Sequence, residues 1–157
     1  MSGQQIFGLQ VVLTFVVYGL VAKWYVSPRL ATLPLGAALQ PLLVLHALRH
    51  LGMVFLVPTV VGPALPASFA VPAAYGDLLA GLLALAALLA LRAHSTVAIP
   101  LTWVFNVVGL LDLINAFYQG LSKNVLLGAA YYIPTFIVPA LVITHLMIFR
   151  MLVRHPR

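Results

Sequence analysis

Long apolar runs, separated by short polar or proline-rich breaks, set the pattern of this chain. A helix that crosses the hydrocarbon core of a bilayer needs about 20 mostly apolar residues. The runs therefore predict five transmembrane helices, at about residues 6–26, 38–61, 75–91, 97–118 and 125–149.

The breaks between these runs have local causes. Proline disfavours helical backbone in the residue before it, and prolines and glycines predict two loops, around Pro28, Pro34, Gly62, Pro63, Pro66 and Pro72. The segment from Arg92 to Ser95 predicts a tight polar turn. Three further prolines lie inside predicted helices: Pro58, Pro134 and Pro139. Each should bend the helix or leave a backbone carbonyl without its hydrogen-bond donor.

Composition supports a membrane environment. Of the 157 residues, 64% are hydrophobic and only 6% are charged, whereas soluble domains carry about 25% charged residues. We therefore expect an all-α integral membrane protein that forms a single transmembrane domain over residues 1–157. The chain has no cysteine, which excludes disulfides, thiolate metal sites and a cysteine nucleophile.

The basic residues predict an orientation. The net charge is +6, and most of the basic residues lie at the ends of apolar runs. They do not form the basic stripe of a nucleic-acid-binding protein, so no nucleic-acid partner is expected. The expected partners are membrane lipids. With the N-terminus outside and the C-terminus cytoplasmic, Lys123 alone lies outside, and six basic residues lie inside: Lys23, Arg29, Arg92, Arg150, Arg154 and Arg157. This distribution satisfies the positive-inside rule and indicates a multi-pass protein of the plasma (inner) membrane.

Ionisable residues within the predicted helices are the candidates for function. Each costs about 2.5–3.5 kcal/mol or more at the centre of a membrane helix, so such residues usually face a functional interior. On the second helix His46, Arg49 and His50 are spaced i, i+3 and i+4, which places them on one face of an α-helix. They predict a polar interior pocket lined by His46, Arg49, His50, Asp77, Asn106, Asp112, Asn115, Tyr131 and His145.

Depth along the helices suggests which of these groups meet. At about 1.5 Å of rise per residue, Arg49 could reach Asp112 if their helices are neighbours, and His46 and His145 lie at a similar depth. Asp77 and Asp112 are the only acidic side chains. Because Arg49 is the only arginine deep within a predicted helix, we expect it to pair with one of these acids. The other acid should then have a histidine, a ligand or a proton as its partner.

The first functional hypothesis is a pocket that binds a small molecule, an ion or a proton for transport or sensing. Carboxylates and histidines in series are typical of proton relays and ion paths. Five helices seldom form a transport path alone, so transport would call for a homo-oligomer. The alternative is a purely structural role, in which Arg49 and Asp112 form a buried ion pair that only stabilises the fold.

Two further hypotheses stay open at this point. The i, i+4 spacing of His46 and His50 suits a divalent metal, with His145 or Asp112 as a further ligand. Alternatively, His46 and His145 could ligate a haem. A membrane-embedded isomerase or cyclase of a lipophilic small molecule could use His50 with Asp112 or Asp77 as catalytic acid and base. Specific catalytic sequence motifs are absent from the chain.

Overall fold

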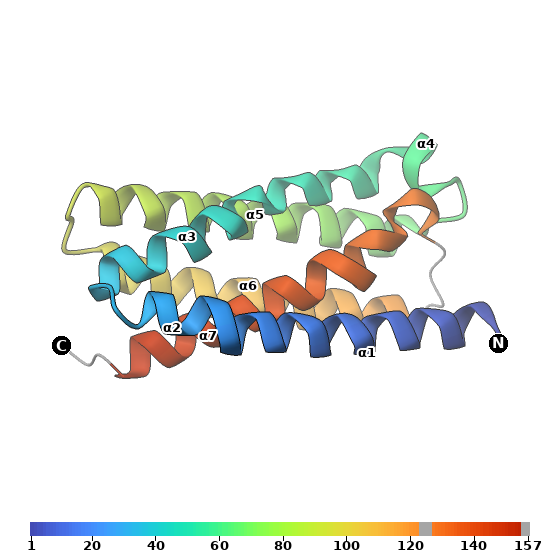
Figure 1. Ribbon diagram of the computed structural model, residues 1–157. Coiled ribbons are helices and arrows are strands. Elements are labelled where there is room, and N and C mark those ends of the chain that lie inside the picture. Colours follow the sequence, from blue (N-terminus) through green and yellow to red (C-terminus); the bar gives the residue numbers. More distant parts are fainter. Residues whose placement is uncertain (123–126, 155–157) are drawn as a thin grey trace.

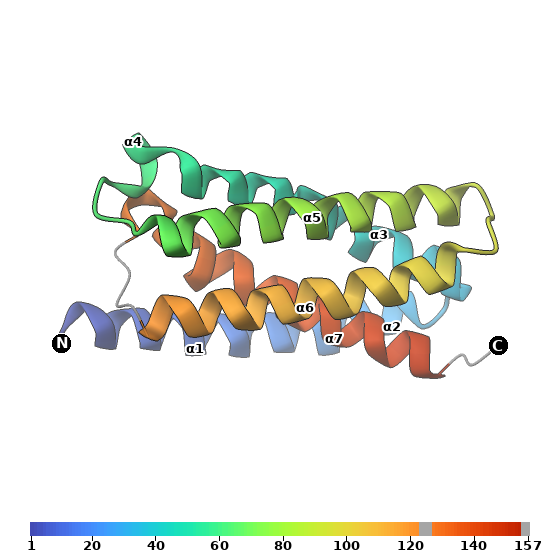
Figure 2. The same cartoon turned by 180° about the vertical axis from the view of Figure 1, so that it is seen from behind.

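The computed structural model describes residues 1–122 and 127–154, and all regular secondary structure in these ranges is helical. Long helical rods lie side by side in an elongated bundle, and the start of α1 and the end of α7 lie at opposite ends (Figure 1, Figure 2). Each rod is long and apolar enough to cross a membrane; the five span Gly3–Leu30, Leu35–Leu56, Ala67–Arg92, Ala98–Ser122 and Gly128–Arg154.

Several rods combine more than one helix type. The first contains α1 (Gly3–Val21), the π-helical η1 (Ala22–Val26) and α2 (Ser27–Leu30). The second contains α3 (Leu35–Ala47) and the 3₁₀-helical η2 (Leu48–Leu56), followed by a short α4 (Pro58–Val61). The third and fourth are α5 (Ala67–Arg92) and α6 (Ala98–Ser122), and the last contains the 3₁₀-helical η3 (Gly128–Tyr131), the π-helical η4 (Ile133–Ile137) and α7 (Val138–Arg154).

The prediction of five apolar spans is confirmed, with corrections to their ends. The third span begins at Ala67 instead of residue 75, so Pro72 lies in the helix and not in the loop. Pro72 lies only five residues after the first residue of this helix, so its missing donor and its ring disturb only the first turns, and the helix continues to Arg92. The second span ends earlier than expected, because Val57 is extended just before Pro58. The expected start of the fifth span, residues 125–126, lies outside the described residues.

Two π turns each come just before a proline. Ser27 donates its backbone N–H to the carbonyl of Ala22 and precedes Pro28, and Val138 donates in the same way to Ile133 and precedes Pro139. A proline ring clashes with the carbonyl four residues earlier in a regular α-helix. The extra residue of a π turn relieves this conflict, so the first span continues to Leu30 instead of ending near Val26.

The core has two apolar layers with a polar layer between them. One layer includes Leu39, Leu43, Phe105 and Ile148, and the other surrounds Phe55, Phe69, Ala73, Ala74 and Ala130. Along the second span, Arg49 falls between these two layers. The polar side chains are therefore enclosed at the middle of the bundle and not at its ends.

The first span packs more loosely than the others. Only 6% of its most apolar stretch is buried, against 28–39% for the other four spans. Its contacts are mainly with α7 and η4, and Figure 1 shows α1 along one edge of the bundle. The remaining spans, which include α3, α5, α6 and α7, supply the residues of the polar layer.

Candidate functional site

Arg49 is the centre of the polar layer. It lies in η2, and its side chain is 1% exposed. Its Nε and Nη2 donate to Oδ1 of Asp77, each at 2.8 Å, and Nη2 also donates to Oδ2 of Asp112 at 2.6 Å. Nη1 donates to the backbone carbonyl of Gly109 at 2.9 Å. One guanidinium thus joins three spans, with all three of its nitrogens hydrogen-bonded.

The two carboxylates reach Arg49 from α5 and α6. Their side chains are 14% exposed for Asp77 and 17% exposed for Asp112, so they lie at the edge of the buried region and the arginine lies inside. The sequence led us to expect one acid without an arginine. That expectation is wrong, because the planar guanidinium offers five donors in a fork and binds both acids at once.

Three glycines make room for this arrangement. A Cβ on Gly76 would collide with the Asp112 carboxylate, and a Cβ on Gly52 would lie 2.6 Å from the Asp77 Cβ. A Cβ on Gly109 would lie 2.8 Å from the His145 ring and 3.0 Å from Arg49 Nη1. These glycines let charged side chains pass between closely packed helices, a role that the sequence pattern alone does not reveal.

His145 lies against the other side of the arginine. Its Nε2 is 3.5 Å from Arg49 Nη1, and its Nδ1 is 2.7 Å from Asn106 Oδ1. The Asn106 amide donates to the His145 backbone carbonyl at 3.2 Å, so its Oδ1 is left to accept from Nδ1. The Asn106 contact therefore sets the tautomer, with the proton on Nδ1 and the Nε2 lone pair toward Arg49.

His46 extends the polar layer beyond His145. The two imidazole rings have centroids 4.1 Å apart, and Phe105 packs against both rings. The Thr144 hydroxyl donates to carbonyls of its own helix, which leaves its oxygen to accept from His46 Nε2 at 3.0 Å. His46 Nδ1 is buried and has no hydrogen-bond partner among the residues that the structure describes.

His50 does not join this group. Its side chain is exposed, and its Nδ1 is 3.0 Å from the carbonyl of Ala47. The expected common face of His46, Arg49 and His50 assumed α-helical geometry, but η2 has 3.0 residues per turn, so i, i+3 align and i, i+4 diverge. His50 is therefore not placed to act with Asp77 or Asp112 as an acid–base pair.

Asn115 and Tyr131 also lie away from the arginine. Asn115 is exposed and accepts a hydrogen bond from Gln119 one turn later on α6. The Tyr131 hydroxyl donates to the side chain of Gln10 on α1. Of the expected pocket, the structure brings together Arg49, Asp77, Asp112, Asn106, His145 and His46.

The geometry does not suit the expected metal or haem sites. Within residues 1–122 and 127–154, no three His, Asp, Glu or Cys side chains gather as a metal site would require. The exposed His50 lies apart from the buried His46 and His145. His46 and His145 pack directly ring against ring, which leaves no space for a macrocycle between two axial ligands.

Comparison with known proteins places the chain in a family. Residues 6–153 match the model of a domain of unknown function, DUF8737. The chain belongs to the DUF8737 family. No curated protein and no solved structure matches it. The DUF8737 match covers all five spans almost completely, so the arginine and both of its carboxylates lie within the family's domain.

The two buried histidines of this DUF8737 domain should differ in their contribution to stability. His46→Phe keeps an aromatic ring against Phe105 and removes a buried Nδ1 that has no partner in the described part of the chain. It gives up one hydrogen bond to Thr144, whose hydroxyl still donates to its own helix. We therefore expect the free energy of unfolding to fall by less than about 1 kcal/mol. His145→Phe leaves Asn106 without its donor and should cost about 1–3 kcal/mol. Unfolding in mixed micelles, followed by circular dichroism, measures both; equal losses would contradict the hydrogen-bond assignment.

Proposed function

We propose that this chain is a multi-pass membrane protein whose Arg49–Asp77–Asp112 cluster reversibly binds a proton for transport or sensing. The apolar rods support membrane insertion, because each is long enough to cross the hydrocarbon core. The proposed orientation keeps the N-terminus outside and the C-terminus cytoplasmic, in the plasma (inner) membrane.

The arrangement of basic residues supports this orientation. Figure 1 places α2, the connection from α5 to α6 and the end of α7 at the same end of the bundle. These segments, with the adjoining η1, carry Lys23, Arg29, Arg92, Arg150 and Arg154. Lys123 and Arg157 lie outside the described residues. Such a basic end is typical of the cytoplasmic side.

The observation that carries the proton-binding proposal is the balance of charge around Arg49. One guanidinium binds two carboxylates, so the fully ionised cluster has a net charge of −1. An uncompensated charge within hydrocarbon is costly, and no other ion pair is present in the described parts of the chain. A proton shared by the two carboxylates neutralises the cluster without needing space for a larger ion.

The histidines lie next to the arginine and do not touch the carboxylates. His145 Nε2 lies 3.5 Å from Arg49 Nη1, and the His46 ring packs against the His145 ring. A guanidinium has no acceptor and keeps its protons, so Arg49 does not pass a proton on to the imidazoles. The proposed proton therefore stays on Asp77 or Asp112. Transport would call for a homo-oligomer, whereas sensing would not.

Infrared difference spectroscopy of the protein in liposomes tests proton binding directly. Stepping the pH from neutral to acidic should give the carbonyl band of a protonated carboxylic acid, and Asp77→Asn or Asp112→Asn should each abolish or shift that band. His50→Gln is the matched control, because it removes an exposed titratable group from the same span as Arg49. A wild-type band that persists in both aspartate variants would overturn the proposal.

A further inference from the structure

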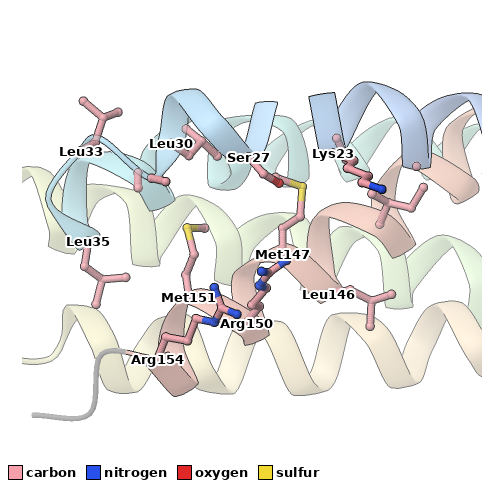
Figure 3. Close-up of a pocket in the computed structure, with 15 residues that line it drawn as sticks. Lys23, Ser27, Leu30, Leu33, Leu35, Leu146, Met147, Arg150, Met151 and Arg154 are labelled. Atoms are coloured by element: carbon pink, nitrogen blue, oxygen red, sulfur yellow. The ribbon is translucent and has the colours of Figure 1, made fainter. Parts of the chain in front are cut away.

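A second feature, separate from the charged cluster, is a cavity between the first span and α7. Its volume is about 680 Å³, and it reaches from Gly19 to the start of α3 on one side and from Ile143 to Arg154 on the other. Figure 3 shows the side chains of both walls. The cavity lies at the basic end of the bundle, because Lys23, Arg150 and Arg154 line it.

Three basic side chains line this cavity. Lys23 comes from η1, and Arg150 and Arg154 come from α7. The two arginines are spaced i, i+4 and therefore lie on one helix face, as Figure 3 shows. The whole chain has only two acidic side chains, and Arg49 binds both of them. No acidic side chain of the same molecule is therefore left to neutralise the basic group of the cavity.

The rest of the cavity is mostly apolar. Leu30, Leu146, Met147 and Met151 supply much of its wall. Gly19 borders open space, since a Cβ added there would meet nothing within 4 Å. Lys23 lies within a π turn, and π turns are frequent at functional sites. The cavity thus combines a cationic end with an apolar wall, which is the complement of an anionic amphiphile.

We propose that this cavity binds an anionic phospholipid of the cytoplasmic leaflet. Lys23, Arg150 and Arg154 bind the phosphate of the headgroup, and an acyl chain lies along the methionine and leucine side chains. Arginine and lysine are the usual phosphate-binding residues, and basic pockets on the cytoplasmic side of membrane proteins bind anionic headgroups. The inference rests on the membrane orientation proposed above and does not involve the proton site.

Native mass spectrometry of the full chain in detergent tests this proposal, with phosphatidylglycerol as the probe and phosphatidylcholine as its zwitterionic counterpart. We expect phosphatidylglycerol to bind more tightly. Each basic residue near an anionic headgroup contributes roughly a factor of five in affinity, so R150Q/R154Q should weaken binding by about 25-fold. Gly19→Phe should also weaken it, by filling the apolar part while leaving every basic residue in place.

The matched control is R29Q/R92Q, which removes the same charge from the same end of the bundle. Arg29 bonds the carbonyl of Tyr25 and Arg92 bonds Gln40, and neither lines the cavity. If R150Q/R154Q and R29Q/R92Q lost the same affinity for phosphatidylglycerol, the lipid would be attracted by the general surface charge of this end, and the proposal would be overturned. Displacement of the lipid by inorganic phosphate would overturn it in favour of a free-anion site.

A second copy of the chain is the other occupant to exclude. If Gly19→Phe changed the oligomeric mass and left phosphatidylglycerol binding intact, the cavity would be a protein interface and the proposal would fail. R150Q/R154Q leaves Asp77 and Asp112 in place, so its infrared band should match that of the wild type. If the wild-type protein shows the infrared band but does not bind phosphatidylglycerol, the lipid proposal fails and the proton-binding proposal does not.

Discussion

Replacing Arg49 with leucine should lower the free energy of unfolding by about 3–5 kcal/mol, the largest effect that we expect from any single substitution. The change leaves Asp77 and Asp112 without the cation that binds both of them, and it removes the donor to the Gly109 carbonyl. Unfolding of the purified protein in mixed micelles, followed by circular dichroism at neutral pH, measures the loss.

A triple variant separates the charge effect from the packing effect. R49L/D77N/D112N removes the cation together with both acids, and replacing a whole buried ionic group by neutral residues is often close to neutral for stability. We therefore expect the triple variant to recover most of the stability that Arg49→Leu loses. An Arg49→Leu protein as stable as the wild type would show that the ion pairs contribute nothing in the membrane-like environment.

Gly52→Ala is the second large expected effect, although it adds a single methyl group. The new Cβ would lie 2.6 Å from the Cβ of Asp77, and a side-chain rotation cannot move a Cβ. Relief requires η2 and α5 to separate, and overpacking of this kind costs about 1–3 kcal/mol, occasionally more. The same unfolding experiment in mixed micelles measures the change.

Two comparisons make the Gly52 result specific. Gly8→Ala adds a methyl group in α1, where a Cβ meets nothing within 4 Å, and it should be neutral or stabilise the helix by about 0.5–1 kcal/mol. Gly76→Ala collides with the end of the Asp112 side chain, so adding Asp112→Ala should rescue it. Adding Asp77→Ala should not rescue Gly52→Ala, because the Asp77 Cβ remains.

The sequence predicted the parts of this structure that follow from apolar length and from position along a helix. Apolar length gave the five spans, and depth along the helices correctly suggested that Arg49 could reach Asp112. The similar depth expected for His46 and His145 agrees with their contact, although the contact is direct and not made through a haem. These features depend on residue type and rise per residue, which a single sequence contains.

The sequence could not predict features that depend on a change of helix type or on helix neighbours. His50 appeared to share a face with Arg49 only because α-helical geometry was assumed at a point where the chain turns 3₁₀-helical. The pairing of Asp77 with Arg49, and the glycines that make it sterically feasible, require knowledge of which helices touch. Gly76, which directly precedes Asp77, is a signal in the sequence that could have indicated a close helix approach here, because small residues let helices pack closely.

The 3₁₀ form of η2 has a mechanical consequence. A 3₁₀-helix rises about 2.0 Å per residue and an α-helix about 1.5 Å, so the nine residues of Leu48–Leu56 would shorten by about 4–5 Å on conversion to α-helix. Conversion would also rotate the two ends of the segment relative to each other. Arg49 lies near the start of this segment. A change of helix type would therefore move and rotate the backbone that carries Arg49, and would change its hydrogen bonds to Asp77 and Asp112.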